Sequence, residues 1–482
     1  MPTPPASLPS DANIAALTKW LKQSGVLFSP YIEARRIADR GIGVVATANI
    51  GAGERLVQIP ITSSALITPI VARKAVVEGV DNGRIMMLPE DSVLPNITTA
   101  AKTTAKRGKR VRLGSTTNIS ARKHTAIHAL TSHQILAYFL YTEAQHPANS
   151  GWAKFLAALP TLEQFESVPL TWLVQDAKEK KKMLAYLPTN TREHAERMSA
   201  QFWADLKAVQ RVFVGADDVE RFLWAWLCVN SRCLYYLMPD TATKPADCMT
   251  LAPFIDFINH SDTPACEIGV YDVKCKEDGT TTKYFGIWTL HDYATGEEIL
   301  LSYGAHTNSF LLCEYGFTME KNINSELDIT HEVMTSLLGG AGDDARRRFL
   351  EHRSYLGDYT VSRDGPSFRT TVALAVCATS LAACDEENST SRAAVLERAQ
   401  LDWFVRTGTE TNARIGKAVA RMLARVLRGV GADAGRQMAA IAAAVGAGHC
   451  DDDGGGGGAV TGCWSHVLRL QTERRTLAEW RG

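Results

Sequence analysis

Four short segments of this 482-residue chain combine residue types that bind ligands or do chemistry. Arg40-Gly41-Ile42-Gly43 heads an apolar run, and its glycines permit positive φ and close backbone approach to a flat or charged ligand. Val229-Asn230-Ser231-Arg232 follows a tryptophan-rich apolar stretch, and an arginine there can clamp a carboxylate. Taken singly, the first segment is more often a simple β-turn, and the second more often a solvated helix end.

The other two segments place polar residues directly beside apolar runs. Asn259-His260-Ser261 follows the apolar stretch 251–258, and buried polar groups need partners. The segment 297–304 ends in Leu-Ser-Tyr-Gly, so the Tyr303 hydroxyl stands at the end of a β-like run, where it can reach a reacting centre. A satisfied core histidine and a rim tyrosine are the alternative interpretations. His260 lacks companion ligands and the ten cysteines form no CxxC pair, so we expect no metal site.

In this order and spacing, the segments together resemble the signature series of SET-domain methyltransferases, and the wider phrasing resembles the RuBisCO large-subunit methyltransferase-like group. The resemblance rests on Gly41-x-Gly43, Asn259-His260-Ser261, Leu301-Ser302-Tyr303-Gly304 and Tyr315-Gly316-Phe317, and it covers residues 26–330. The tail from 331 matches in composition and position. The resemblance implies an α+β fold: a SET core interrupted by a helical insert and followed by an all-helical C-terminal substrate-binding domain.

The same resemblance implies S-adenosylmethionine as cofactor and a lysine of a non-histone protein as acceptor, with ribosomal or translation proteins as the family-level substrate. Tyr303 matches the catalytic tyrosine, and Tyr271 a second tyrosine that lines the lysine channel. Leu234 and Tyr236 occupy a variable stretch of that channel, so histidine stays open as the acceptor. A catalytically silent binding module is a further alternative. The implied cofactor-binding residues are Arg40, Gly41, Ile42, Ser231, Arg232, Asp256, Asn259, His260 and Phe317.

Apolar patterning predicts the elements that must position these residues. Asp11 can cap a helix whose apolar face is Ile14, Leu17, Trp20 and Leu21. Further helices are expected at 128–143, 193–212, 219–230, 343–355, 369–384, 391–405 and 412–447, and β-like runs at 42–47, 55–59, 283–290 and 298–302. A basic stretch at about 95–125 lacks periodicity and is expected to be a disordered loop, and 451–458 a flexible linker.

These elements divide the chain into five expected parts. They are an N-terminal helix (1–25), the first part of the SET domain (26–128), a helical insert (129–228), the second part of the SET domain (229–330) and the helical domain (331–482). Lysine plus arginine (52) equals aspartate plus glutamate (52), which gives no reason to expect binding to nucleic acid or membranes. The N-terminus shows no signal peptide, and no apolar run is long enough to cross a membrane, so we expect the cytoplasm or nucleus. We also expect a monomer whose partner is a protein substrate. The basic run 106–112 fits either a solvated loop or a nuclear signal.

Overall fold

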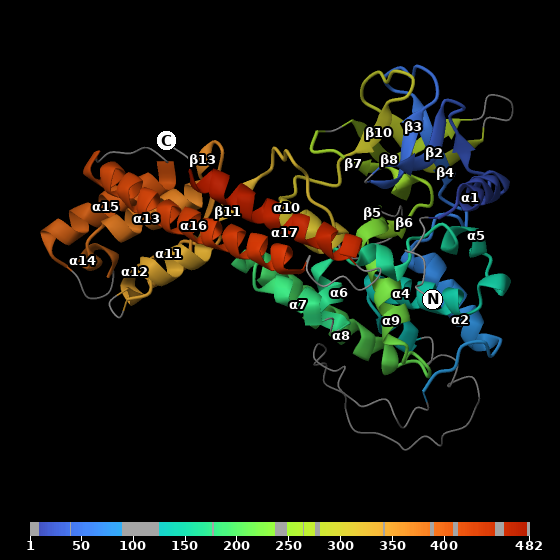
Figure 1. Cartoon of the computed structure of the whole chain (residues 1–482), viewed down its shortest axis with the longest axis horizontal. Coiled ribbons are helices and arrows are strands. Elements are labelled where there is room, and N and C mark those ends of the chain that lie inside the picture. Colours follow the sequence, from blue (N-terminus) through green and yellow to red (C-terminus); the bar gives the residue numbers. More distant parts are fainter. Residues whose placement is uncertain are drawn as a thin grey trace, which may run out of the picture. The chain divides into compact units, whose positions relative to one another are not determined.

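The computed structural model describes residues 9–38, 40–88, 125–175, 178–236, 248–263, 265–274, 280–340, 343–385, 390–407, 413–448 and 457–479 (Figure 1). It divides into two compact units, which are described separately. The first comprises 3–166 and 197–304, and the second 167–196 and 305–482. The loop expected at 95–125 lies outside the described residues except for Thr125, as does the expected linker except for Gly457 and Gly458, which begin a helix. The five-part division of the chain stays a prediction.

Two four-stranded sheets form the β part of the first unit. One has the order β1 (Leu27–Phe28), β4 (Arg55–Pro60), β9 (Thr281–Thr289), β8 (Cys266–Lys274). The other has the order β2 (Ile32–Ile37), β3 (Gly41–Ala46), β10 (Glu298–Leu301), β7 (Asn259–His260). A small pair joins β5 (Cys233–Tyr235) to β6 (Met249–Leu251). Strands β3 and β10, like β4 and β9, are neighbours from distant parts of the sequence, so this topology brings the motifs together.

Capping residues explain where two helices of the first unit begin. They are α1 (Asp11–Gln23), α2 (Pro69–Asp81), α4 (Ser132–Gln145), α5 (Ala153–Leu156), α9 (Val219–Arg232), the part of α8 (Thr189–Gln210) from 197 onward, and short 3-10 turns at Pro147–Asn149, Leu162–Phe165 and Ile255–Phe257. Helix α4 starts with a capping box, in which Thr131 and Gln134 exchange side-chain and backbone hydrogen bonds. The expected cap of α1 was wrong by one residue: Ser10 accepts from the Asn13 amide, and Asp11 is the first helical residue.

Helix α9 is the element that carries Arg232 to the site. Its apolar side packs on α4, and Phe222, Leu223 and Leu227 are fully buried. The indole of Trp226, on the same helix, donates to Asp205 at 3.0 Å, which satisfies a buried N–H group. Asp218 caps the helix at its start. Packing and capping thus fix the axis of α9, and Arg232 is its last residue.

The second unit is helical with a small sheet. Its helices are α6 (Pro169–Val174), α7 (Lys178–Leu184), the start of α8, α10 (Asn308–Tyr315), α11 (Thr330–Ser336), α12 (Asp344–His352), α13 (Phe368–Ala378), α14 (Leu381–Cys384), α15 (Arg392–Thr407), α16 (Ala413–Gly448) and α17 (Gly457–Ala478). The sheet consists of β11 (Glu326–Asp328), β12 (Thr360–Ser362) and β13 (Gly365–Pro366). The expectation of helices throughout missed these strands, because two or three residues carry no periodicity. Among the described residues, no helix is long and apolar enough to span a membrane.

Candidate active site

Three of the four sequence motifs meet on neighbouring strands of the sheet β2-β3-β10-β7. Strand β10 pairs with β3 through Glu298↔Val45 and Ile299↔Val44. On its other side β10 pairs in parallel with β7, which consists of Asn259 and His260. Hydrogen bonding between the strands therefore sets residues some two hundred positions apart in the sequence beside one another.

Glu298 ties two of these motifs together. Its Oε1 accepts from Asn259 Nδ2 at 2.8 Å, and its Oε2 forms an ion pair with the Arg40 guanidinium at 3.0 Å. The same Asn259 amide donates to the Ile42 carbonyl at 3.3 Å. The Glu298 side chain is 18% exposed, so these charge-assisted bonds are partly shielded from water. Sequence reasoning gave Glu298 no role; the available signal was an acid at the head of an otherwise apolar β run.

The two glycines of the first motif serve different purposes. Gly41 has φ +77°, a conformation that side chains with a Cβ rarely adopt. Gly43 instead leaves space: a Cβ there would lie 2.9 Å from Asn259 Nδ2 and 2.9 Å from Glu298 Oε1. The same Cβ would lie 2.7 Å from Ile37 Cγ1, so the missing side chain at Gly43 makes room both for Ile37 and for the Asn259–Glu298 hydrogen bond.

Arg232 and Asp256 form a second polar pair. Arg232 NH1 donates to the Asp256 carboxylate at 3.2 Å and to its backbone carbonyl at 3.2 Å. The Asp256 side chain is 1% exposed and that of Arg232 is 24% exposed. Burial raises the pKa of Asp256, and the Arg232 charge partly offsets that rise. Asp256 Oδ1 and Arg232 Nε are buried and have no hydrogen-bond partner among the described residues, so the pair keeps an acceptor and a donor for a ligand.

Hydrogen bonds hold both the backbone and the side chain of Tyr303. Its backbone N–H donates to His260 Nδ1 at 3.1 Å, and its hydroxyl donates to the Ile258 carbonyl at 2.9 Å. The His260 and Tyr303 rings lie 5.1 Å apart between centroids, and His260 is buried. Because the phenol hydrogen is donated to Ile258, any further partner of the phenol oxygen has to be a hydrogen-bond donor. His260 therefore positions the tyrosine.

The other expected site residues lie elsewhere or use their side chains locally. The Ser231 hydroxyl donates to the Leu227 carbonyl of its own helix at 2.7 Å, so any ligand contact would come from its backbone. Tyr271 lies in the other sheet, where Arg55 is 4.5 Å above its ring and Trp288 packs edge-on at 5.8 Å. Phe317 belongs to the second unit. The roles of Tyr271 and Phe317 stay predictions.

Tyr271 covers a glycine of the neighbouring strand. A Cβ on Gly286 would lie 2.8 Å from the Tyr271 hydroxyl, and Trp288 approaches Gly269 in the same manner at 3.0 Å. Aromatic rings laid over sheet glycines compensate for the packing that those glycines lack. Burial raises the pKa of Tyr271 to about 12, so its phenol is neutral at ordinary pH. Among the described residues, no group of three or more His, Cys, Asp or Glu could hold a metal ion.

The chain belongs to the SET-domain family, because the SET domain profile matches residues 41–304, more than half of its length. A profile described as the Ribosomal lysine N-methyltransferase 2 C-terminal domain matches residues 325–444. Both matches agree with the order of motifs and helices described above. The family resemblance drawn from the sequence is confirmed.

Three curated relatives are 27–28% identical to this chain over the residues that align. Ribosomal lysine N-methyltransferase 2 of Saccharomyces cerevisiae is 27% identical over 282 residues, which cover 51% of this chain and 58% of that protein. Ribosomal lysine N-methyltransferase set11 of Schizosaccharomyces pombe is 28% identical over 361 residues, or 75% and 74%. SET domain-containing protein 4 of Homo sapiens is 27% identical over 248 residues, or 50% and 54%. The chain thus matches little more than half of the budding-yeast and human relatives.

Solved structures with the same fold include the SET domain of LSMT bound to methyllysine and AdoHcy. It has a TM-score of 0.56 at 14% identity, covering 98% of this chain and 90% of that chain. Rubisco LSMT bound to AdoMet has a TM-score of 0.55 at 13% identity, covering 97% and 90%. At these identities the likeness establishes the fold, and the expected α+β class is confirmed.

Proposed function

We propose that this protein is an S-adenosylmethionine-dependent protein-lysine N-methyltransferase that acts on a ribosomal protein. The observation that carries the proposal is the cluster of Asn259, His260 and Tyr303, in which motif residues meet on adjacent strands and fix one another. The names of the two yeast relatives and of the C-terminal profile support a lysine acceptor in a ribosomal protein. We expect the protein to act as a monomer in the cytoplasm or nucleus.

The polar atoms left without partners fit the methionine end of the cofactor. Arg232 Nε is a buried donor and Asp256 Oδ1 a buried acceptor, and a zwitterion offers a carboxylate to the first and an ammonium to the second. Arg40, Gly41 and Ile42 would border the cofactor through their backbone, while Asn259 and His260 would seat its adenosine part. When bound, S-adenosylmethionine supplies an electrophilic methyl group on a positive sulfonium. We expect micromolar binding, about −8 kcal/mol.

The acceptor amine must be neutral when it attacks. Free lysine has a pKa of about 10.4, and transfer into an apolar channel beside a positive sulfonium lowers that pKa by desolvation and by charge repulsion. The neutral Nζ would take the methyl group that the sulfonium supplies, with the cofactor leaving as the neutral thioether, and water would carry away the proton from the amine. A base among the side chains is therefore not required.

Tyr303 would align the reacting atoms. Because Ile258 takes the phenol hydrogen, the phenol oxygen can accept from an amine N–H and hold the nitrogen on the line of attack. Alignment of this kind contributes about 7–11 kcal/mol in well-oriented reactions. Tyr303 is in this account the catalytic residue, while His260 positions it through the bond to its backbone amide.

Methylation of ribosomal subunits tests the proposal. The full-length protein is incubated with labelled S-adenosylmethionine and purified ribosomal subunits, and the labelled protein is identified. We expect one ribosomal protein to be labelled by the wild type and far less by Tyr303→Phe, with cofactor affinity retained by calorimetry. The proposal fails if the wild type does not bind the cofactor at millimolar concentration, or if Tyr303→Phe labels as fast as the wild type.

A further inference from the structure

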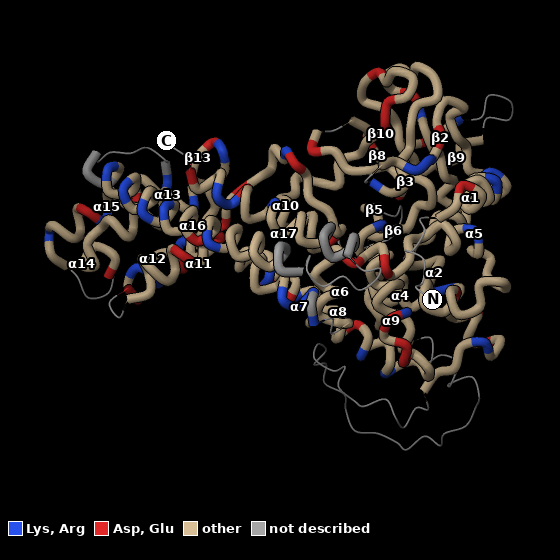
Figure 2. The backbone as a smooth tube through the Cα atoms, in the orientation of Figure 1, with Lys and Arg blue, Asp and Glu red and all other residues tan. Residues whose placement is uncertain are grey.

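Helix α16 of the second unit exposes only cations and small residues. Between 416 and 444, every exposed residue of this helix is lysine, arginine, alanine or glycine. Successive cations lie 4, 4 and 3 residues apart, which corresponds to rises of about 6, 6 and 4.5 Å and keeps them within about a quarter turn. We call this row the α16 cation face: Lys417, Arg421, Arg425 and Arg428 (Figure 2).

Buried residues on the opposite side of the helix keep the cation face exposed. Leu423, Val426, Leu427 and Val430 are buried in the core of the second unit, on the reverse side of the same turns. Rotation of α16 to hide its cations would expose these residues to water. The cation face is therefore a permanent part of the surface.

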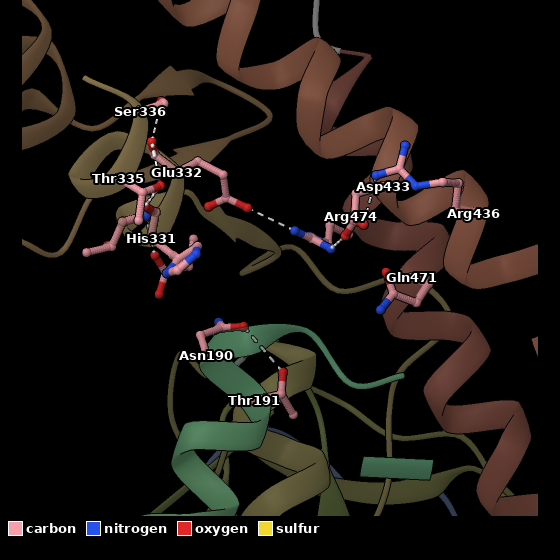
Figure 3. Close-up of polar contacts among 12 residues, drawn as sticks. Asn190, Thr191, His331, Glu332, Thr335, Ser336, Asp433, Arg436, Gln471 and Arg474 are labelled. Atoms are coloured by element: carbon pink, nitrogen blue, oxygen red, sulfur yellow. Dashed lines mark hydrogen bonds and ion pairs between the residues drawn. The ribbon is translucent and has the colours of Figure 1, made fainter. Parts of the chain in front are cut away.

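Carboxylates do not neutralise this row within the described part of the chain. Its four side chains form no ion pair with any described residue, and Arg421 donates only to the Lys417 carbonyl of its own helix, at 3.1 Å. The only acid in the sequence of α16 is Asp433. It is already engaged by Arg474 at 2.7 Å and Arg436 at 3.2 Å (Figure 3). Four like charges thus face water along about 16 Å of one helix.

We propose that the α16 cation face binds the phosphate backbone of duplex nucleic acid, RNA or DNA. A row of exposed cations with small residues between them lets a polyanion approach closely and release its counterions. A docked protein would need apolar or aromatic anchors, and this face has none. It also lacks aromatic rings to stack unpaired bases and amide side chains to read base edges. Binding is thus independent of sequence and favours a duplex.

The total charge conceals this surface. Equal numbers of acids and bases gave no reason to expect nucleic acid, whereas the helical spacing gathers four of the bases on one side. The inference does not depend on the proposed methyl transfer. A ribosomal substrate would make such a surface useful, since the target protein is then presented beside duplex RNA.

Fluorescence anisotropy with the full-length protein tests the proposal. The probes are 20-base-pair RNA and DNA duplexes of one sequence and the matching single strands, titrated between 50 and 200 mM salt. The test variant is K417Q/R421Q/R425Q/R428Q, in which glutamine preserves helix propensity. The control K19Q/R197Q/K207Q/R211Q removes four exposed cations, which lie in α1, in α8 and directly after α8. A second control, R421K/R425K/R428K, keeps the charge. Thermal melting verifies that every variant is folded.

Four phosphate contacts predict a slope of log affinity against log salt of about −3.6, or roughly 100-fold weaker binding across the range. The test variant should bind at least tenfold more weakly at 50 mM salt with a much shallower slope, while both controls resemble the wild type. RNA and DNA duplexes should bind within about threefold of each other, and single strands more weakly. An unchanged test variant, no duplex binding by the wild type, or tighter binding of a poly-glutamate peptide would overturn the proposal.

Discussion

The central ion pairs of the first unit (the SET unit) and of the second unit (the helical unit) differ in how far they are exposed to water. In the SET unit, Asp256 is 1% exposed and its carboxylate is held by Arg232, while Glu298 is 18% exposed and bonds to two motif residues. In the helical unit, Arg474 joins Glu332 and Asp433, but these carboxylates are 25% and 36% exposed, and the cation face of α16 is open to water. The Asp256 carboxylate therefore depends on Arg232, whereas the Glu332 and Asp433 carboxylates have water as an alternative partner.

That difference has an energetic consequence. A charge that loses its partner inside the protein keeps its desolvation cost, whereas an exposed charge is resolvated. Substitutions in the SET unit should therefore cost more than matched substitutions in the helical unit.

Removal of a buried carboxylate should be the most costly change. Asp256→Ala leaves the three-quarters buried Arg232 without its ion-pair partner and should lower the free energy of unfolding by roughly 3–4 kcal/mol in urea titrations. Asp256→Asn keeps an acceptor and should lose less. The matched change Glu332→Ala leaves Arg474 its bond to Asp433 and should cost about 0–1 kcal/mol. Equal losses for Asp256→Ala and Glu332→Ala would show that the contrast is wrong.

Loss of the Tyr303 hydroxyl should appear mainly in turnover. Tyr303→Phe is expected to lower kcat by roughly 2–4 kcal/mol of transition-state stabilisation, with cofactor affinity retained. The Ile258 carbonyl also loses a partner, so the free energy of unfolding should fall slightly, by about 1 kcal/mol. Tyr271→Phe is the matched comparison, because it removes the same hydroxyl from the second tyrosine predicted to line the lysine channel. The contacts described for Tyr271 involve its ring, so we expect a smaller loss of kcat, about 1 kcal/mol or less than tenfold. A loss as large as that of Tyr303→Phe would mean that both hydroxyls act in catalysis.

His466 on α17 gives the helical unit a pH-dependent stability. Burial, with a contribution from Arg469, lowers its pKa from 6.5 to about 4, and its Nδ1 lies 2.9 Å from Thr318 Oγ1. The unfolded chain binds this proton more tightly, so stability is complete above pH 6.5 and falls as pH drops toward 4. We expect a loss of about 2–3 kcal/mol across that window. His466→Gln should flatten this part of the pH profile; a profile identical to that of the wild type would refute the assignment.

Glycines should behave differently in the two units. Gly43→Ala forces a Cβ against Asn259 and Glu298 and should destabilise the protein by about 1–3 kcal/mol while weakening cofactor binding. Gly435 lies in the interior of α16 with no atom within 4 Å of an added Cβ, so Gly435→Ala should stabilise the protein by about 0.5–1 kcal/mol. Thermal melting of both variants distinguishes the signs. A neutral Gly43→Ala would mean that the Asn259–Glu298 bond adapts easily.

Much of the first unit could be predicted, because its elements carry local signals. The helix expected at 219–230 is Val219–Arg232, and the run expected at 298–302 is Glu298–Leu301. Strand β8 was missed because Glu267, Asp272 and Lys274 interrupt its apolar pattern, and its pairing with β9 supplies the stability instead. The pattern of apolar residues predicts a helix or strand only where buried residues recur at regular intervals along that element.

The sequence predicted which residues belong to the site, but only part of how they bond to one another. Motif order pointed to Asn259, His260 and Tyr303, but the bridging role of Glu298 depends on sheet pairing that no single segment encodes. The acceptor of the Tyr303 hydroxyl is a backbone carbonyl, which has no side-chain signature. The α16 cation face was in contrast encoded locally, since its residues recur at intervals of 4, 4 and 3 within a helix that the sequence predicted, but the balanced total charge drew attention away from it.

Residue-level mass spectrometry of the methylated product tests the central claim most directly. A ribosomal protein labelled by the wild-type enzyme is digested, and the modified peptide is fragmented to locate the methyl group. The Tyr303 geometry and the desolvated-amine mechanism predict methyl-lysine at one position, absent when Tyr303→Phe replaces the wild type. Methyl-histidine at that position, or an equal yield of methyl-lysine from Tyr303→Phe, would contradict the account.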